Sequence, residues 1–182
     1  MHASQFPRIR QWFVAGLTLA YWALLAWQHL HAGVPAHSFG AREDMPAISN
    51  WWGALVMPVL AWTLTGLAQA RLKALPADQG DAALRHTLLA FVGALTYGAV
   101  MALLFTVDPE HTALSTLFFA LPVVGLILPV FRPEYVLGFY LGMLITFGPV
   151  IPLVIGLAVA MVSALLQVLL RPLFRRMSRV AR

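Results

Sequence analysis

Histidines and carboxylates, the side chains of this chain most able to do chemistry, gather in one polar segment and one short turn. The segment 28–50 holds His29, His31, His37, Glu43 and Asp44, and the turn 108–111 holds Asp108, Glu110 and His111. Imidazole and carboxylate groups are ligands for zinc, copper, iron and manganese. The sequence therefore suggests a divalent transition metal as cofactor. The four histidines would be its ligands, and the four acids would be further ligands or hydrogen-bond partners of the ligands.

This metal site depends on where the first helix ends. Successive residues of an α-helix turn by about 100°, so His29 and His31 would point roughly 200° apart if both were helical. They can share one ion only if the helix ends before Leu30 and the chain becomes extended, because residues two apart then lie on one face. Gly33 and Pro35 favour such an end.

The same residues have simpler explanations. Their spacing matches no standard zinc signature, and ordinary loop residues at a membrane surface would show the same composition. Asp108, Pro109 and Glu110 also suit the start of a helix, with a capping acid, a proline at the first helical position and an acid in the first turn. Arg132-Pro133-Glu134 forms a second turn of this type.

The composition identifies the class of protein. Hydrophobic residues make up 60% and charged residues 10% of the 182-residue chain, and the mean hydropathy is +0.80. Soluble domains carry about 25% charged residues, so we expect an integral membrane protein with the lipid bilayer as its partner. We assign the net charge of +5 to cytoplasmic loops and anionic headgroups and expect no nucleic-acid partner. The absence of cysteine excludes disulfides and thiolate chemistry.

Apolar stretches long enough to cross a bilayer divide the chain into six predicted spans. We expect an all-α, polytopic helical bundle in a single membrane domain, 1–182, with spans at 12–30, 51–70, 87–107, 112–131, 135–147 and 151–170. The fifth span would be about 20 Å long, against roughly 30 Å of hydrocarbon. It therefore thins the bilayer, forms a re-entrant hairpin with the sixth span, or starts earlier than residue 135.

Charge distribution predicts the orientation. With six spans and both termini in the cytoplasm, every lysine and arginine except Arg42 lies inside, which is eleven of the 12. With five spans the division is six against six, so the positive-inside rule favours six. We expect a bacterial inner membrane, with the histidine and carboxylate cluster on the outer face.

Within the spans, small residues and prolines are the informative features. Gly138 and Gly142 form a G-x-x-x-G helix-packing motif on the fifth span. Pro58, Pro122 and Pro129 free backbone carbonyls that could line a cavity. The spans are nearly free of charge, which argues against a relay of ionised side chains.

Three functions fit these features. The first is a metal-binding membrane enzyme or metal-handling protein that uses the outer-face cluster. The second is a permease for a small, mostly neutral or lipid-like solute, with a pathway among spans two, four and five. The third is an accessory subunit that binds a membrane-protein partner, or a second copy of itself, through Gly138 and Gly142. The sequence does not choose between them.

Overall fold

The computed structural model of the protein describes residues 5–38, 47–110 and 112–180, with side chains except at 37, 38, 77 and 169–180. The described elements are α1 (Phe6–His31), β1 (Ala36–Ser38), β2 (Ala47–Ser49), the 3-10 helix η3 (Asn50–Trp52), α2 (Gly53–Lys73), α3 (Ala77–Val107), α4 (Thr112–Ile127), α5 (Pro133–Phe147) and α6 (Ile151–Val180).

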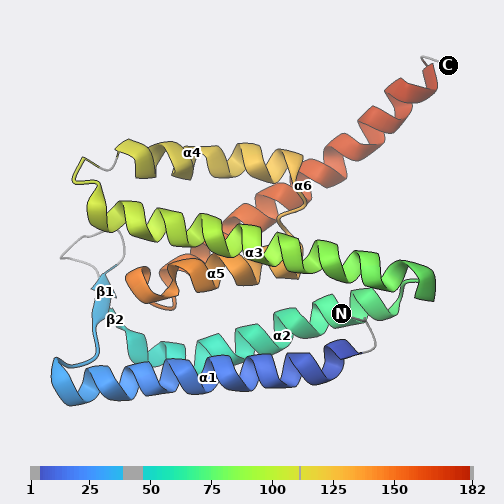
Figure 1. Ribbon diagram of the computed structural model, residues 1–182. Helices are drawn as coiled ribbons and strands as arrows, with labels where there is room; N and C mark the ends of the chain where they lie inside the picture. The colour runs from blue at the N-terminus through green and yellow to red at the C-terminus, as the bar shows by residue number, and fades with distance from the viewer. Residues whose placement is uncertain (1–4, 39–46, 111, 181–182) are drawn as a thin grey trace.

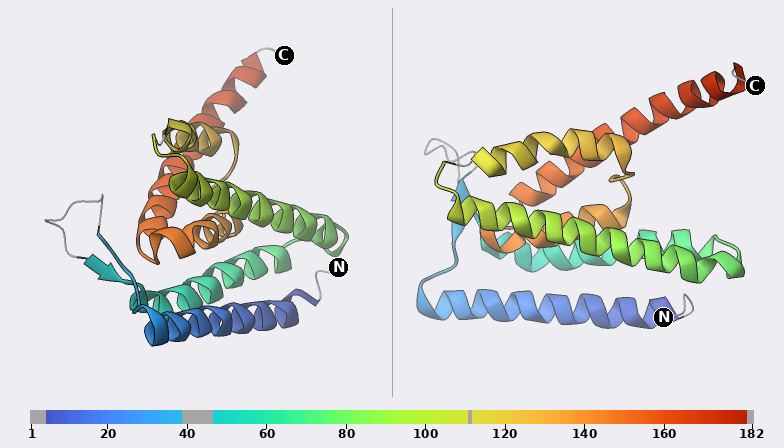
Figure 2. Two further views of the ribbon diagram at one scale, coloured as in Figure 1. Left: turned by 60° about the vertical axis from the view of Figure 1, so that its left-hand side comes forward. Right: turned by 45° about the horizontal axis from the view of Figure 1, so that its top comes forward.

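Successive helices run in opposite directions (Figure 1). One end of the bundle, the ribbon end, carries β1, β2 and the α3–α4 and α5–α6 connections. The other end, the tail end, carries both chain termini and the α2–α3 and α4–α5 connections. α6 extends past the other helices at the tail end, and the views in Figure 2 show the same arrangement. The basic residues at the ends of α2 and α6 therefore lie at one end of the bundle.

The segment between α1 and α2 contains two short β-strands and a 3-10 helix. β1 and β2 pair as an antiparallel ribbon in which Ala36 faces Ser49. The Ser49 side chain accepts a hydrogen bond from the backbone N–H of Trp51 at 3.3 Å and so caps η3. This ribbon is absent from the sequence expectation, because its strands have only three residues each and no alternating apolar pattern.

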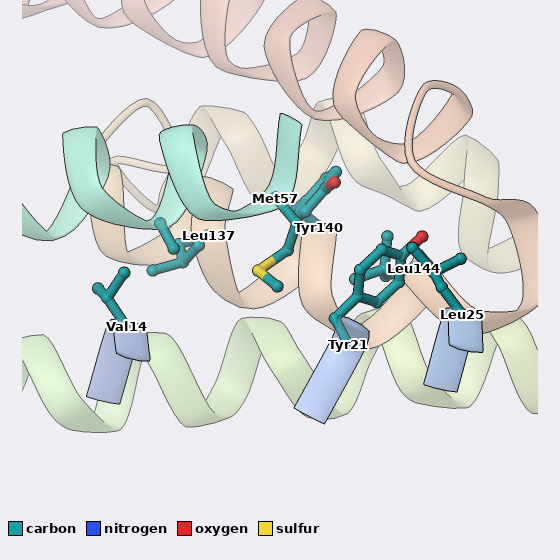
Figure 3. Close-up of a cluster of buried hydrophobic side chains, with 8 residues drawn as sticks. Val14, Tyr21, Leu25, Met57, Leu137, Tyr140 and Leu144 are labelled. Carbon is teal, nitrogen blue, oxygen red and sulfur yellow. The ribbon is translucent and has the colours of Figure 1, made fainter. Parts of the chain in front are cut away.

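α5 is the central helix. It contacts α2, α3 and α6, and most of its residues are buried. Figure 3 shows side chains of α1 and α2 meeting those of α5 in an apolar cluster, the α1–α2–α5 core. Its buried members are Val14, Tyr21, Leu25, Met57, Ala61, Leu137, Tyr140 and Leu144. A helix of 15 residues is only about 22 Å long. α5 is the central helix because it is buried among longer helices, not because of its length.

α5 approaches α3 backbone to backbone through glycines. A Cβ atom at Gly142 would lie 2.7 Å from the backbone N of Ala99, and one at Gly138 would lie 2.9 Å from that of Leu95. On the facing helix, a Cβ at Gly98 would lie 2.7 Å from the Phe139 carbonyl oxygen. Real Cβ atoms do not come this close, so the two helices can keep this separation only with glycine at these positions.

Two backbone carbonyls accept hydrogen bonds from side chains of neighbouring helices. Each carbonyl lies four residues before a proline, which has no N–H to donate to it. Pro58 lacks the N–H that would bond the Ala54 carbonyl, and the Trp22 indole N–H donates to that oxygen at 2.9 Å. The Gly125 carbonyl lies four residues before Pro129 and receives no hydrogen bond from it. The Ser163 hydroxyl donates to this carbonyl oxygen at 2.7 Å. Both carbonyls thus join helices, and Ala54 is also one of the residues that line a cavity beside Trp22 and Trp51.

Among the residues that the structure describes, four helices are long and apolar enough to cross a membrane: α1, α3, α6 and the segment 50–73 that contains α2. α4 and α5 are shorter apolar helices. Large apolar side chains cover much of the outer surface; Leu30 is 79% and Trp12 is 74% exposed. Soluble proteins rarely expose so much apolar surface. The structure is thus consistent with a helical membrane bundle.

The glycine contact predicts a difference between two Gly→Ala substitutions. We expect Gly142→Ala to destabilise the protein by about 1–3 kcal/mol, because the new methyl group overlaps the α3 backbone. Gly16→Ala, on α1, meets no atom within 4 Å and should be neutral or slightly stabilising. Thermal unfolding in detergent, followed by far-ultraviolet circular dichroism, measures both. Equal effects of the two substitutions would contradict the close α3–α5 contact.

Candidate functional site

The structure does not bring His29 and His31 to one ion. α1 continues to His31, so both histidines are helical and the condition for a shared ion is not met. His31 Nδ1 lies 2.9 Å from the Trp27 carbonyl oxygen, and the two rings stack with centroids 4.8 Å apart. The His29 ring instead contacts Trp51, at 5.8 Å between centroids. The helix end before Leu30 that Gly33 and Pro35 would favour is not seen, because α1 continues one residue past the end of the predicted span 12–30.

The other predicted metal residues divide into two groups. The side chain of His37, and Glu43, Asp44 and His111 entirely, lie outside the described residues. The Asp108 carboxylate accepts a hydrogen bond from the Ala113 backbone N–H at 3.0 Å, as a cap for the first turn of α4 would, and Glu110 is exposed in the turn before it. Within the described residues, no three His, Asp or Glu side chains are close enough together to hold a metal ion.

A buried ion pair at the tail end is the most unusual polar feature of the described structure. Arg71 Nη2 donates to Glu134 Oε1 at 2.8 Å and to the Thr87 hydroxyl oxygen at 2.9 Å. The Glu134 side chain is 3% exposed, whereas that of Arg71 is 34% exposed. The pair joins the last turn of α2 to the first turn of α5, and Thr87 connects both to α3. A carboxylate in such a place must be paired, because burying it alone is costly.

Local sequence and packing place each of these groups. Arg132 has extended backbone at the N-cap of α5, and Pro133 at the first helical position fixes the helix start, so Glu134 falls in the first turn. There the N-terminal end of the helix dipole favours its negative charge. The glycine contact between α3 and α5 then holds Glu134 beside Thr87, while Arg71 reaches the pair from the last turn of α2.

An apolar pocket adjoins the ion pair. It has a volume of about 110 Å³ and lies between α1, α2, α3 and α5. Its polar lining comes from Arg10, Thr65, Thr87 and Glu134, and its apolar walls include Phe6, Phe13, Leu64, Ala68, Leu88, Phe91 and Leu137. An engineered apolar cavity of roughly 150 Å³ binds benzene, so a group of a few heavy atoms fits here. We call this the tail-end pocket.

Arg10 is held against one wall of the tail-end pocket. Its guanidinium donates to the Thr65 hydroxyl at 3.1 Å, to Gln69 Oε1 at 3.3 Å and to the Trp62 carbonyl oxygen at 2.9 Å. It also lies 3.9 Å from the centre of the Trp62 ring. These contacts hold the positive charge of Arg10 at the pocket. The cation–π contact with the Trp62 ring stabilises the guanidinium there.

The pocket is closed on its ribbon side. Along α1, α2 and α5, the residues that line it are followed toward the ribbon end by members of the α1–α2–α5 core, and Leu137 belongs to both. Figure 3 shows Met57, Tyr140 and Tyr21 meeting beyond Leu137. The Tyr21 hydroxyl donates to the Asn50 carbonyl oxygen at 3.3 Å. The tail-end pocket is therefore a recess that ends on a packed core.

Two polar atoms of the ion pair have unused hydrogen-bonding capacity. Glu134 Oε2 and Arg71 Nη1 are both buried, and neither has a hydrogen-bond partner among the described residues. An unpaired buried acceptor of this kind costs stability unless a water or a ligand completes it. Both atoms are enclosed by the surrounding side chains, so they are a buried feature beside the pocket and not part of its surface.

A second cavity lies on the far side of α5. It has a volume of about 250 Å³, and its walls come from α3, α4, α5, α6 and the α4–α5 connection. Its hydroxyl groups are those of Tyr97 and Tyr135, and the Tyr97 hydroxyl already donates to the Leu117 carbonyl oxygen at 2.6 Å. This cavity is larger but offers no buried charged group, so the tail-end pocket is the stronger candidate site.

In the sequence, Glu134 is recognisable only as part of a helix-start turn, and its pairing with Arg71 is not predicted. The charge pattern does contain a signal for this residue. In the six-span topology the acids on the arginine-rich side are Asp78, Asp81 and Glu134, and only Glu134 lies at the start of a nearly uncharged helix. An acid at the edge of an apolar segment requires a partner. Which arginine supplies it depends on helix packing, which the sequence pattern does not give.

The described residues thus form a helical bundle with four candidate membrane-spanning helices and a small apolar pocket beside a buried ion pair at one end. Comparison of the chain with protein-family models, with curated protein sequences and with solved structures gives no significant match. The function must therefore be argued from the geometry.

Proposed function

We propose that the chain is a six-pass inner-membrane protein with both termini in the cytoplasm, in which α4 and α5 cross despite their length. The common end of the two termini and the clustering of basic residues there support this orientation. Burial of α5 among longer helices supports a full crossing, because its ends need not meet lipid directly. The tail-end pocket then lies at the cytoplasmic end of the bundle.

The function that the geometry supports best is that of a permease for a small, neutral or lipid-like solute. The observation that carries it is an apolar pocket with a buried carboxylate at its margin, closed on the other side by the α1–α2–α5 core. A recess closed at one end is what an alternating-access protein shows in an inward-facing state. The pathway would run between α1, α2, α3 and α5, in place of the expected path along spans two, four and five.

The two other functions have less support. A metal site on the outer face would have to use the histidines and acids outside the described residues, without His29 and His31 acting together. An accessory role would need a helix face other than that of Gly138 and Gly142, because α3 of the same chain occupies that face.

The orientation predicts opposite labelling of two single-cysteine variants. The chain has no native cysteine, so a membrane-impermeant maleimide reports one site at a time. Gln79→Cys, in the first turn of α3, should be protected in intact cells and labelled only after lysis. Ala36→Cys, in β1, should be labelled in intact cells. Labelling of both sites from the outside, or of neither, would contradict a crossing by α2, and labelling of Gln79→Cys alone would contradict the orientation.

Transport predicts a solute flux that depends on an open pocket. Proteoliposomes should take up glycerol or 1,2-propanediol at least several-fold faster than empty liposomes in stopped-flow light scattering, or should speed dithionite quenching of an NBD-labelled diacylglycerol. Ala68→Phe fills the pocket from α2 and should abolish the protein-dependent rate, whereas Ala70→Phe, exposed on the same helix, should leave it unchanged. Equal rates for all three proteins, or no protein-dependent rate for any probe, would overturn the proposal.

A further inference from the structure

We infer that the last turns of α6, residues 170–180, form a basic amphipathic helix that binds the anionic headgroups of the membrane surface at the tail end. We call these residues the α6 extension. The inference requires only that the bundle lies in a membrane. It uses neither of the two cavities, and it does not depend on the permease proposal.

The α6 extension begins where the bundle ends. The apolar part of α6 that is long enough to cross a membrane runs over 151–168. In its last turn, Gln167 Nε2 donates to the Leu128 carbonyl oxygen at 2.9 Å, one residue after the end of α4. α6 nevertheless continues as a helix to Val180. In Figures 1 and 2 its last turns run away from the ribbons of the other helices. The extension therefore leaves the bundle sideways, at its tail end.

The sequence of the α6 extension separates apolar from basic positions around the helix axis. At about 100° per residue, the apolar positions fall within an arc of roughly 120°, and the arginines fall within a separate arc of roughly 140°. A helix with an apolar arc and a strongly basic arc is typical of those that lie in the plane of a membrane surface. The apolar residues are Leu170, Leu173, Phe174, Met177 and Val180, and the basic residues are Arg171, Arg175, Arg176 and Arg179.

Charge selects an anionic surface. The last acidic residue of the chain is Glu134, so the arginines of the α6 extension have no acid beside them in the sequence. Each basic residue near an anionic membrane surface strengthens the association about fivefold. The exposed basic residues of the bundle at the same end are Arg8, Lys73, Arg85 and Arg132.

The apolar arc distinguishes a lipid surface from other anionic partners. At a bilayer the apolar positions enter the boundary between headgroups and acyl chains, while arginines on the other arc reach the phosphates. A nucleic acid or a soluble acidic protein would meet the arginines but leave the apolar arc in water. A lipid surface satisfies both arcs at once.

Pro172 stands at the junction between the membrane-crossing part of α6 and the α6 extension. It has no N–H to donate to the Val168 carbonyl, and helices bend most easily at such a position. A bend here brings the extension onto the lipid beside the bundle. The Gln167 bond to Leu128 lies before the bend and is unaffected by it.

Spin labels on the full-length protein in nanodiscs test the inference. The chain has no native cysteine, so Met177→Cys and Arg179→Cys each carry one nitroxide, and these two positions lie about 200° apart around the helix. We measure the accessibility of each label to oxygen, which concentrates in lipid, and to a water-soluble nickel chelate. With phosphatidylglycerol present, the oxygen-to-nickel ratio should be at least threefold higher at 177 than at 179. In nanodiscs of phosphatidylcholine alone this contrast should fall by at least half.

Charge variants that carry the Met177→Cys label identify what binds. Glutamine at all four arginines of the α6 extension should remove the response to phosphatidylglycerol, whereas lysine at the same positions keeps the charge and should preserve it. The matched control removes as many exposed basic residues from the bundle, and it should respond as the parent does. Its substitutions are Arg8→Gln, Lys73→Gln, Arg85→Gln and Arg132→Gln.

Four results would overturn the inference. Equal ratios at 177 and 179 would show that the extension stands in water. A contrast of the same size in phosphatidylcholine alone would show that anionic lipid is not recognised. Equal effects of the two glutamine sets would show that only the total charge matters. Dipolar broadening between the labels of two protein copies in one nanodisc would show that a second copy covers the apolar arc. Solute flux is measured separately, so each of these results leaves the permease proposal to its own test.

Discussion

The close approach of α3 and α5 is the constraint on which the rest of the structure depends. Gly98, Gly138 and Gly142 let the two backbones meet at distances that any side chain would prevent. Since lipid chains are as apolar as leucine, helices in a membrane associate through such packing rather than through water exclusion. The contact places the first turn of α5 next to α3, and with it Glu134 next to Thr87. A wider separation would leave this carboxylate without its partners.

The ion pair combines a stabilising contact with an incomplete one. Glu134 gains a charge-assisted hydrogen bond from Arg71 and the helix-dipole field of α5, which together offset the cost of its burial. One carboxylate oxygen is still without a partner among the described residues. Apolar replacements of a buried pair are often as stable as the pair itself, so stability alone gives little reason to keep it.

Sequence reasoning identified the class of protein but not its site. Composition alone predicts a membrane protein, and each expected span overlaps one helix of the structure. The Gly138 and Gly142 motif was visible as a packing face, but the pattern could not say whether α3 or another protein would occupy it. A shared ion at His29 and His31 required a helix end before Leu30, which Gly33 and Pro35 favoured, whereas α1 continues to His31. The pairing of Arg71 with Glu134 joins residues 63 positions apart, and only the arrangement of three helices creates it.

The central claim is that Arg71 and Glu134 interact inside the fold, beside the tail-end pocket. A double-mutant cycle tests it most directly, with unfolding free energies measured for the parent, Arg71→Met, Glu134→Gln and the double variant. For residues in direct contact we predict a coupling energy of about 1–3 kcal/mol, so that the double variant is more stable than the sum of the single effects implies. A coupling energy near zero would show that the two side chains act independently, and it would contradict the account.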